Sequence, residues 1–253
     1  MLEVTGLSKR FGGLAALDEL WLEVAAGEIR GIIGPNGAGK TTLFNVISGT
    51  YRPTAGSIKF EGREIGGLGP SRIAELGVIR TFQRVALFGK YSVLENVMVG
   101  RHRHAREGLW GAIVGSGRRI EAANRDRARE IVDFIGLGAA RDEPARNLPY
   151  GHQRALGVAI ALAAEPRLLM LDEPVAGMNS AETLEMANLI RRIRERWGVT
   201  VLLVEHDMRT VMGLCEKITV LDFGKKLAEG APREISENKD VIEAYLGADE
   251  FVA

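Results

Sequence analysis

Three short, mainly apolar runs stand out along the chain, at residues 29–33, 168–171 and 200–204. Each run is continuous rather than alternating with polar residues, which is typical of strands buried on both faces of a parallel sheet. Segments with a helical period separate the runs, as the crossover between parallel strands requires. The pattern predicts an α/β fold with a parallel core.

The clearest predicted helix leads into the third run. Apolar residues recur on one of its faces from Met186 to Trp197. Asn179 and Glu182 have the spacing of a capping box at the start, and Gly198 is the usual residue just past a helix end. We therefore expect a crossover helix between these limits.

A different pattern follows near the C-terminus. Residues 218–221 and 227–228 are short apolar segments on either side of Phe223 and Gly224. Two short runs around a glycine turn predict a hairpin. We expect this antiparallel part to lie apart from the parallel core.

Composition narrows the class of protein. The 253 residues contain 33 basic and 33 acidic side chains, so the net charge of zero gives no global attraction for nucleic acid. The longest uncharged stretch, residues 41–51, is shorter than the ~20 residues of a membrane span. The N-terminus has no signal-peptide pattern, and the single cysteine, Cys215, excludes an internal disulfide. We expect a cytoplasmic globular protein in which Cys215 is a small, half-buried apolar residue.

One local charge bias interrupts this balance. Residues 101–130 contain eight arginines and four acidic residues, a local net charge of +4. One interpretation is a solvated helical face, which most charged runs form. The other is contact with an anionic membrane surface beside the apolar stretch around Trp110.

A phosphate-binding loop follows the first apolar run. Residues 34–41 fit the pattern G-x-x-x-x-G-K-[ST] between a predicted strand and a predicted helix. Glycines let backbone N–H groups surround a phosphate, the helix N-terminus adds a positive dipole end, and the lysine reaches the outer phosphates. The predicted nucleotide-binding residues are Gly34, Pro35, Asn36, Gly37, Ala38, Gly39, Lys40, Thr41 and Thr42.

Two carboxylates end the second apolar run. Asp172 and Glu173 follow residues 168–171, where the carboxyl end of a parallel strand faces the ligand edge of the sheet. An aspartate there suits Mg²⁺ held through water, and a glutamate suits polarisation of the attacking water. A solvated turn is the alternative, and the phosphate-binding loop makes it the weaker one.

With these motifs, the chain resembles the ATP-binding subunits of ABC transporters over nearly its whole length. Phe11 matches the aromatic residue that stacks on adenine, and residues 34–42 match the Walker A loop. Gln83 matches the glutamine that contacts the metal region and signals to the permease, and His206 matches the switch histidine of the γ-phosphate. The resemblance implies the catalytic residues Glu173, His206 and Gln83 and the magnesium-site residues Thr41, Gln83 and Asp172.

The segment 148–154, Leu-Pro-Tyr-Gly-His-Gln-Arg, stands where this family has its signature sequence. The resemblance implies that Tyr150, Gly151 and His152 contact the nucleotide of a partner chain. Pro149 replaces the usual serine and cannot donate a hydroxyl hydrogen bond. We therefore expect backbone N–H groups at Gly151 and the helix start to make that contact.

Further features resemble the larger ATPase of branched-chain amino-acid importers: the tyrosine in the signature, residues 9–13, 177–179 and 241–247, and the long insert after Gly100. The resemblance implies an ATP-hydrolysing, Mg²⁺-dependent subunit that powers uptake of branched-chain or hydrophobic amino acids. The alternatives are an ATPase for urea, amide or aromatic-acid uptake or lipid export, and a soluble ABC protein without a transport role.

The implied partners are a second, similar but non-identical ABC ATPase, two transmembrane permease subunits and, indirectly, an external solute-binding protein, without nucleic acid. The implied location is peripheral, on the cytoplasmic face of the plasma membrane. The expected fold is α/β, a P-loop NTPase (RecA-like) parallel core with an antiparallel part and an inserted α-helical subdomain. We expect one ABC ATPase domain, with its core at residues 1–88 and 155–230, the helical subdomain near 89–154 and a helical tail at 231–253.

Overall fold

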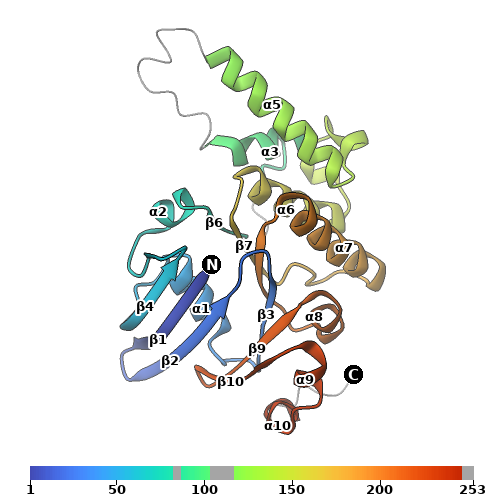
Figure 1. Ribbon diagram of the computed structural model, residues 1–253. Helices are drawn as coiled ribbons and strands as arrows, with labels where there is room; N and C mark the ends of the chain where they lie inside the picture. Colours follow the sequence, from blue (N-terminus) through green and yellow to red (C-terminus); the bar gives the residue numbers. More distant parts are fainter. Residues whose placement is uncertain (82–86, 103–116, 247–253) are drawn as a thin grey trace.

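The computed structural model describes residues 1–81, 87–102 and 117–246. At its centre lies a six-stranded sheet with the strand order β10-β9-β3-β8-β7-β6 (Figure 1). Its strands are β3 (Ile29–Ile33), β6 (Val78–Arg80), β7 (Leu168–Asp172), β8 (Thr200–Val204), β9 (Lys217–Asp222) and β10 (Lys225–Gly230). Every residue of β3, β7 and β8 is buried, so these strands are covered on both faces.

The parallel core is confirmed, with one correction. β6, β7, β8, β3 and β9 pair in parallel, and the three predicted apolar runs form β3, β7 and β8. β9 and β10 pair antiparallel as predicted, but the expectation that this hairpin lies apart from the core is wrong. Gly31 of β3 pairs with Ile218 of β9, so the hairpin is an edge of the core sheet. Turn residues fix the pairing of two neighbouring strands but do not say which sheet they join.

A second sheet supplies the larger antiparallel part. Its order is β2-β1-β4-β5, with β1 (Leu2–Phe11), β2 (Leu14–Val24), β4 (Ala55–Phe60) and β5 (Arg63–Glu64). One apolar cluster joins this sheet to the core sheet and to α1 (Lys40–Ile47), with Leu22, Phe44 and Met170 among its buried members. α1, which begins at Lys40, is therefore held firmly against both sheets.

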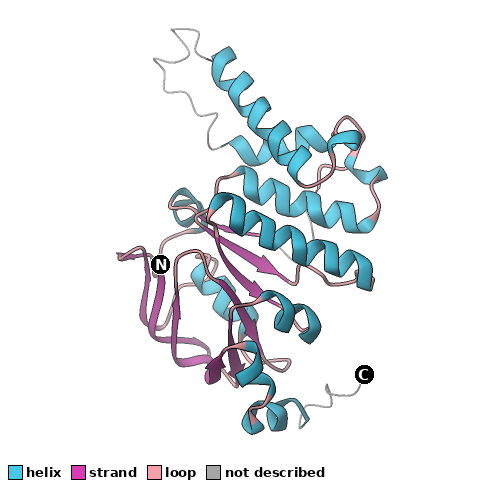
Figure 2. Ribbon diagram, turned by 45° about the vertical axis from the view of Figure 1, so that its right-hand side comes forward, coloured by secondary structure: helices cyan, strands magenta, loops and turns pink. Residues whose placement is uncertain are grey.

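Helices cover the opposite face of the core sheet (Figure 2). They carry most of a second apolar cluster and are α3 (Val93–Gly100), α5 (Gly117–Phe134), α6 (Tyr150–Ala163), α7 (Ser180–Trp197) and α8 (Met208–Leu214). The limits predicted for α7 are confirmed, because Asn179 and Glu182 form a capping box and Gly198 ends the helix at a φ of 63°. Shorter elements complete the description: α2 (Pro70–Glu75), η2 (Gly138–Ala140), η3 (Ala145–Asn147), α9 (Pro232–Ser236) and α10 (Lys239–Leu246).

The described part of the basic segment makes two kinds of ion pair. On α5, Arg127 pairs with Glu130 three residues on, at 2.5 Å, as a solvated helical face predicts. Arg101 departs from that interpretation, because it is buried and pairs at 2.6 Å with Glu165, 64 positions away. Trp110 lies outside the described residues.

The C-terminal helices pack against the core beyond β10 (Figure 1). Val241 and Tyr245 of α10 are both buried, and Cys215 is buried rather than half-buried, with 6% of its surface exposed. None of the helices in the described part of the chain has the length and apolarity of a membrane span. The expected division into a core, a helical subdomain and a tail stays a prediction, and its limit at residue 154 falls within α6.

Candidate nucleotide-binding site

The phosphate-binding loop connects β3 to α1, as its sequence predicts. The backbone conformation explains why two positions of the loop are glycine. Gly34 and Gly39 have φ values of 146° and 103°, which side chains disfavour. A Cβ atom on Gly39 would also lie 2.6 Å from the carbonyl oxygen of Ala16. Only glycine therefore allows the loop to turn tightly against β2 and to present its N–H groups at the start of α1.

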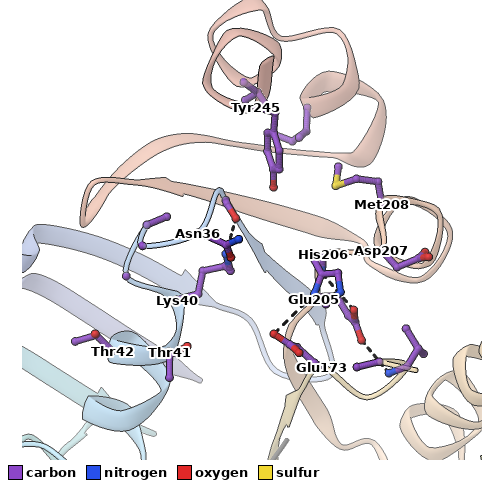
Figure 3. Close-up of a pocket in the computed structure, with 18 of the residues that line it drawn as sticks. Asn36, Lys40, Thr41, Thr42, Glu173, Glu205, His206, Asp207, Met208 and Tyr245 are labelled. Carbon is purple, nitrogen blue, oxygen red and sulfur yellow. Dashed lines mark hydrogen bonds and ion pairs between the residues drawn. The ribbon is translucent and has the colours of Figure 1, made fainter. Parts of the chain in front are cut away.

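Lys40 folds back over this loop. Its Nζ donates hydrogen bonds to the carbonyl oxygens of Gly34, at 2.5 Å, and Pro35, at 2.9 Å. Thr41 and Thr42 follow on α1 and line the same cleft of about 1580 Å³ (Figure 3). Of the nine predicted nucleotide-binding residues, eight line this cleft: Gly34, Asn36, Gly37, Ala38, Gly39, Lys40, Thr41 and Thr42. Pro35 is the exception.

The opposite wall of the cleft carries the predicted catalytic pair (Figure 3). Glu173 follows β7 in the left-handed region, at a φ of 48°, and its N–H donates to the carbonyl of Val204. His206 Nδ1 lies 3.8 Å from Glu173 Oε1, and the histidine side chain is 64% exposed. Non-glycine residues in this conformation cost strain and concentrate at functional sites. The structure thus brings Glu173 and His206 together, facing Lys40.

Phe11 stands at the edge of the cleft. It ends β1, is 43% exposed, and lines the cleft with the phosphate-binding loop. Tyr51 packs edge-on against it, with ring centroids 5.3 Å apart and planes at 78°. Lys9 Nζ also lies over the Phe11 ring, 4.9 Å from its centre. Phe11 is therefore a partly exposed ring at the cleft edge, held by an aromatic and a cationic neighbour.

Asp172 ends β7, behind Glu173. Its Oδ2 accepts a hydrogen bond from Arg80 Nη2 at 2.7 Å, and Arg80 Nη1 donates to Asn45 Oδ1 on α1. Arg80 thus joins β6, β7 and α1, the three elements that position the predicted motifs. This residue was not singled out from the sequence, because its partner is 92 positions away.

A magnesium ion prefers oxygen ligands and keeps several waters or phosphate oxygens around it. Asp172 and Thr41 offer such oxygens from the ends of β7 and α1. Within the described residues, no group of three or more His, Cys, Asp and Glu residues could enclose a metal. A site shared between the protein and nucleotide phosphates fits this donor set. Gln83, the third predicted ligand and a predicted catalytic residue, lies outside the described residues.

The signature residues Tyr150, Gly151 and His152 form the first turn of α6, with Pro149 at the N-cap position. In the described part of the chain, none of the three lines the cleft that holds Lys40 and Glu173. The structure therefore does not bring them to this chain's own phosphate-binding loop. The resemblance assigns them instead to the nucleotide of a partner chain.

Glu205 is a buried residue of the site that the sequence analysis missed. It is 1% exposed and accepts hydrogen bonds from the backbone N–H groups of Val175, at 2.9 Å, and His206, at 3.2 Å. Burial raises its pKa above the ordinary 4.5, against the lowering effect of these bonds. The signal in the sequence was a lone carboxylate between an apolar strand and His206. Glu205 therefore connects the loop after Glu173 to His206.

Comparison with known proteins agrees with this geometry. Residues 17–176 match the sequence model of the ABC transporter family, and residues 225–250 match that of the branched-chain amino acid ATP-binding cassette transporter. The chain is 45% identical over 249 residues to the high-affinity branched-chain amino acid transport ATP-binding protein LivG of Salmonella typhimurium, and the alignment covers 98% of both chains.

Solved structures show the same fold. The ADP conformation of MJ1267, an ATP-binding cassette of an ABC transporter, superposes with a TM-score of 0.87 at 29% identity, covering 98% of both chains. A dimeric post-hydrolysis state of the ATP-binding cassette MJ0796, bound to ADP and Pi, has a TM-score of 0.76 at 25% identity, covering 92% of this chain and 99% of that one. The latter shows that a cassette of this fold forms a dimer.

Proposed function

Because the chain belongs to the ABC transporter family, we propose that it is the ATP-hydrolysing subunit of an importer for branched-chain or other hydrophobic amino acids. One observation carries the amino-acid class: the match to LivG runs through the whole chain, including the C-terminal segment at residues 225–250. That segment forms β10, α9 and α10, and Val241 and Tyr245 line the far end of the cleft.

Different residues of the cleft bind different parts of ATP. N–H groups of the loop between Gly34 and Gly39, with Lys40, hold the phosphates, and the Phe11 ring stacks on adenine. Thr41, Asp172 and Gln83 would hold the magnesium ion. When bound, Mg²⁺ neutralises developing charge on the phosphate oxygens.

Hydrolysis then depends on Glu173 and His206. The Glu173 carboxylate lies across the cleft from Lys40 and orients and polarises the attacking water. His206 donates a hydrogen bond to the γ-phosphate from a side chain that is 64% exposed and can turn toward it. Glu205 holds the backbone of both segments in register.

The signature residues complete the site of a second chain. Tyr150, Gly151 and His152 lie outside this chain's own cleft, so two ATPase chains arranged head to tail form two composite sites. The partner is a similar but non-identical ABC ATPase. Closure of the pair on ATP drives two transmembrane permease subunits, which receive solute from an external binding protein, and nucleic acid takes no part.

This assignment places the chain on the cytoplasmic face of the plasma membrane as a peripheral subunit. The decisive experiment is a gentle pull-down of the tagged chain from membranes of its native host, followed by ATPase assays of the recovered complex. We expect two permeases, a second ATPase, and hydrolysis stimulated by leucine, isoleucine or valine with the cognate binding protein.

Other outcomes identify the alternatives. If only urea, amides or aromatic acids stimulate hydrolysis, the importer takes up that solute instead of branched-chain amino acids. If the chain is recovered with a lipid-export complex, it powers lipid export. Recovery without permeases, in the soluble fraction, would overturn the transport role. In the assembled complex, Glu173→Gln should trap the closed, ATP-bound state, and wild-type hydrolysis by this variant would contradict the role of Glu173.

A further inference from the structure

The hydroxyl of Tyr150 makes a contact that the nucleotide role does not explain. It donates a hydrogen bond of 2.9 Å to the carbonyl oxygen of Ala176, in the loop that follows Glu173. The tyrosine side chain is half exposed, yet its hydroxyl faces its own chain. The signature tyrosine therefore connects α6 to the loop that follows Glu173.

A buried arginine reinforces this contact. Arg154, one turn further along α6, donates from Nε to the Tyr150 hydroxyl at 3.0 Å and from Nη2 to the same Ala176 carbonyl at 3.0 Å. Its guanidinium also lies 5.4 Å from the centre of the Tyr150 ring. The hydroxyl thus accepts one hydrogen bond and donates another, and this network is closed and cooperative.

The backbone around the network leaves little room for movement. Gly177 has a φ of 78°, and a Cβ atom there would lie 3.2 Å from the Tyr150 hydroxyl. A Cβ atom on Gly151 would lie 2.8 Å from Glu182 Oε1, at the start of α7. Three segments therefore pack as one unit: the first turn of α6, the first turn of α7 and the loop that contains Ala176 and Gly177.

From this unit the contacts continue to both catalytic residues. The N–H of Ala176 donates to the carbonyl of Glu173 at 3.3 Å, and the next residue back, Val175, donates to Glu205. Glu205 in turn accepts from the N–H of His206. Hydrogen bonds thus connect Tyr150 through Ala176 to the turn that holds Glu173.

We propose that Tyr150 is a positioning residue, whose hydroxyl fixes the loop after Glu173 through Ala176 and so couples the signature of this chain to its own catalytic glutamate. The inference rests on the proposed function, in which the signature contacts the nucleotide of the second chain. Occupancy of the partner's site then acts on hydrolysis in this chain's site, through side chains of a single subunit.

The test compares Tyr150→Phe with the parent, with kcat measured in the assembled transporter complex and hydrogen exchange measured in the purified, nucleotide-free chain. Removing one hydroxyl keeps the ring, and we expect kcat for ATP to fall about threefold to tenfold while KM changes less than about twofold, because one net hydrogen bond to the Ala176 carbonyl is lost. Hydrogen exchange should accelerate at residues 175–178 and stay unchanged at residues 40–47. Tyr91→Phe is the matched control, since Tyr91 is exposed to a similar extent, 51% against 48%.

Unchanged exchange at residues 175–178 in Tyr150→Phe would overturn the inference, and so would a kcat equal to that of Tyr91→Phe. A rise of KM with kcat unchanged would also overturn it, because it would assign Tyr150 to nucleotide binding. If Tyr150→Phe fails to fold, Arg154→Lys removes the guanidinium fork and is judged by the same two readouts. An inactive parent complex would contradict the proposed function instead, and the exchange comparison in the nucleotide-free chain would still decide the role of Tyr150.

Discussion

Arg80 and Asp172 form a buried ion pair, with 2.7 Å between Nη2 and Oδ2 and with 7% and 11% of their side chains exposed. The pair puts a permanent positive charge beside the carboxylate that the family resemblance assigns to magnesium. Arg80 also bonds Asn45 on α1, so the same guanidinium sets the distance between the phosphate-binding helix and β7. Asp172 is therefore oriented by contacts within the protein itself.

We expect Arg80→Met to destabilise the nucleotide-free protein by about 2 to 4 kcal/mol, because it leaves Asp172 buried without its counter-charge. Addition of Mg²⁺ with ADP should restore more stability to this variant than to the parent, since the metal replaces the lost charge. Urea unfolding with and without Mg²⁺ and ADP measures both effects.

The control for this prediction is Arg72→Met. Arg72 pairs with Glu75 on the surface, with 57% and 43% of the side chains exposed. Its loss should cost less than about 0.5 kcal/mol, as exposed ion pairs usually do. Equal destabilisation by the two substitutions would show that Asp172 does not depend on Arg80.

Glu205 should make stability fall as the pH rises. Burial raises its pKa above 4.5, so the folded state holds the proton more tightly than the unfolded chain. Its contribution is therefore greatest below about pH 4.5 and is lost as the pH rises through the folded-state pKa. A neutral Glu205→Gln substitution should cost most stability near pH 4 and less at pH 7. Chemical denaturation of both proteins between pH 4 and 8 tests the trend, and a penalty that grows with pH would contradict it.

Glu229 should behave in the opposite way. Partial burial raises its pKa, but the hydrogen bond from Lys217 and the charges of Arg30 and Lys226 outweigh this and lower the pKa to about 2. A lowered pKa contributes stability above the unfolded value of 4.5, and this is lost as the pH falls toward 2.

We therefore expect Glu229→Gln to cost about 1 to 2 kcal/mol at pH 7, after allowance for solvent screening of the lysines. The cost should shrink between pH 4.5 and pH 2. Urea titrations across this range measure it, with Glu237→Gln as the exposed control, since Glu237 pairs with Arg233 at the surface. A constant difference over the range would rule out the titration of Glu229.

The sequence predicted the features that depend only on residues close together in the chain. The loop at residues 34–42, the α7 cap at Asn179 and the strand ends at Asp172 and Val204 follow from spacing within one or two elements, and the structure has them in place. The hairpin of β9 and β10 was predicted as a pair but assigned to the wrong part of the fold, because its sheet is decided by contact with β3.

Residues whose partners lie far away in the sequence were not identified by the sequence analysis. Arg80 and Asp172 are 92 positions apart in the sequence, and Glu205 and Val175 are 30 apart. No local sequence pattern therefore predicts either contact. Tyr150 was noticed in the sequence as part of the signature segment, but the partner of its hydroxyl depends on how closely α6 approaches the Ala176 carbonyl. Side-chain hydrogen bonds of this kind need the packed fold before they can be assigned.

The packing of Gly31 against Cys215 gives a last prediction. A Cβ atom on Gly31 would lie 2.9 Å from Cys215 Sγ, so Gly31→Ala overpacks β3 against the end of α8 and should cost about 1 to 3 kcal/mol. Burial raises the thiol pKa to about 12, so Cys215 serves here as a small neutral side chain that alanine can replace. In a Cys215→Ala background, where the sulfur is absent, Gly31→Ala should cost less than about half as much. Denaturant unfolding of the four proteins measures this coupling, and strictly additive effects would show that Gly31 is required for another reason.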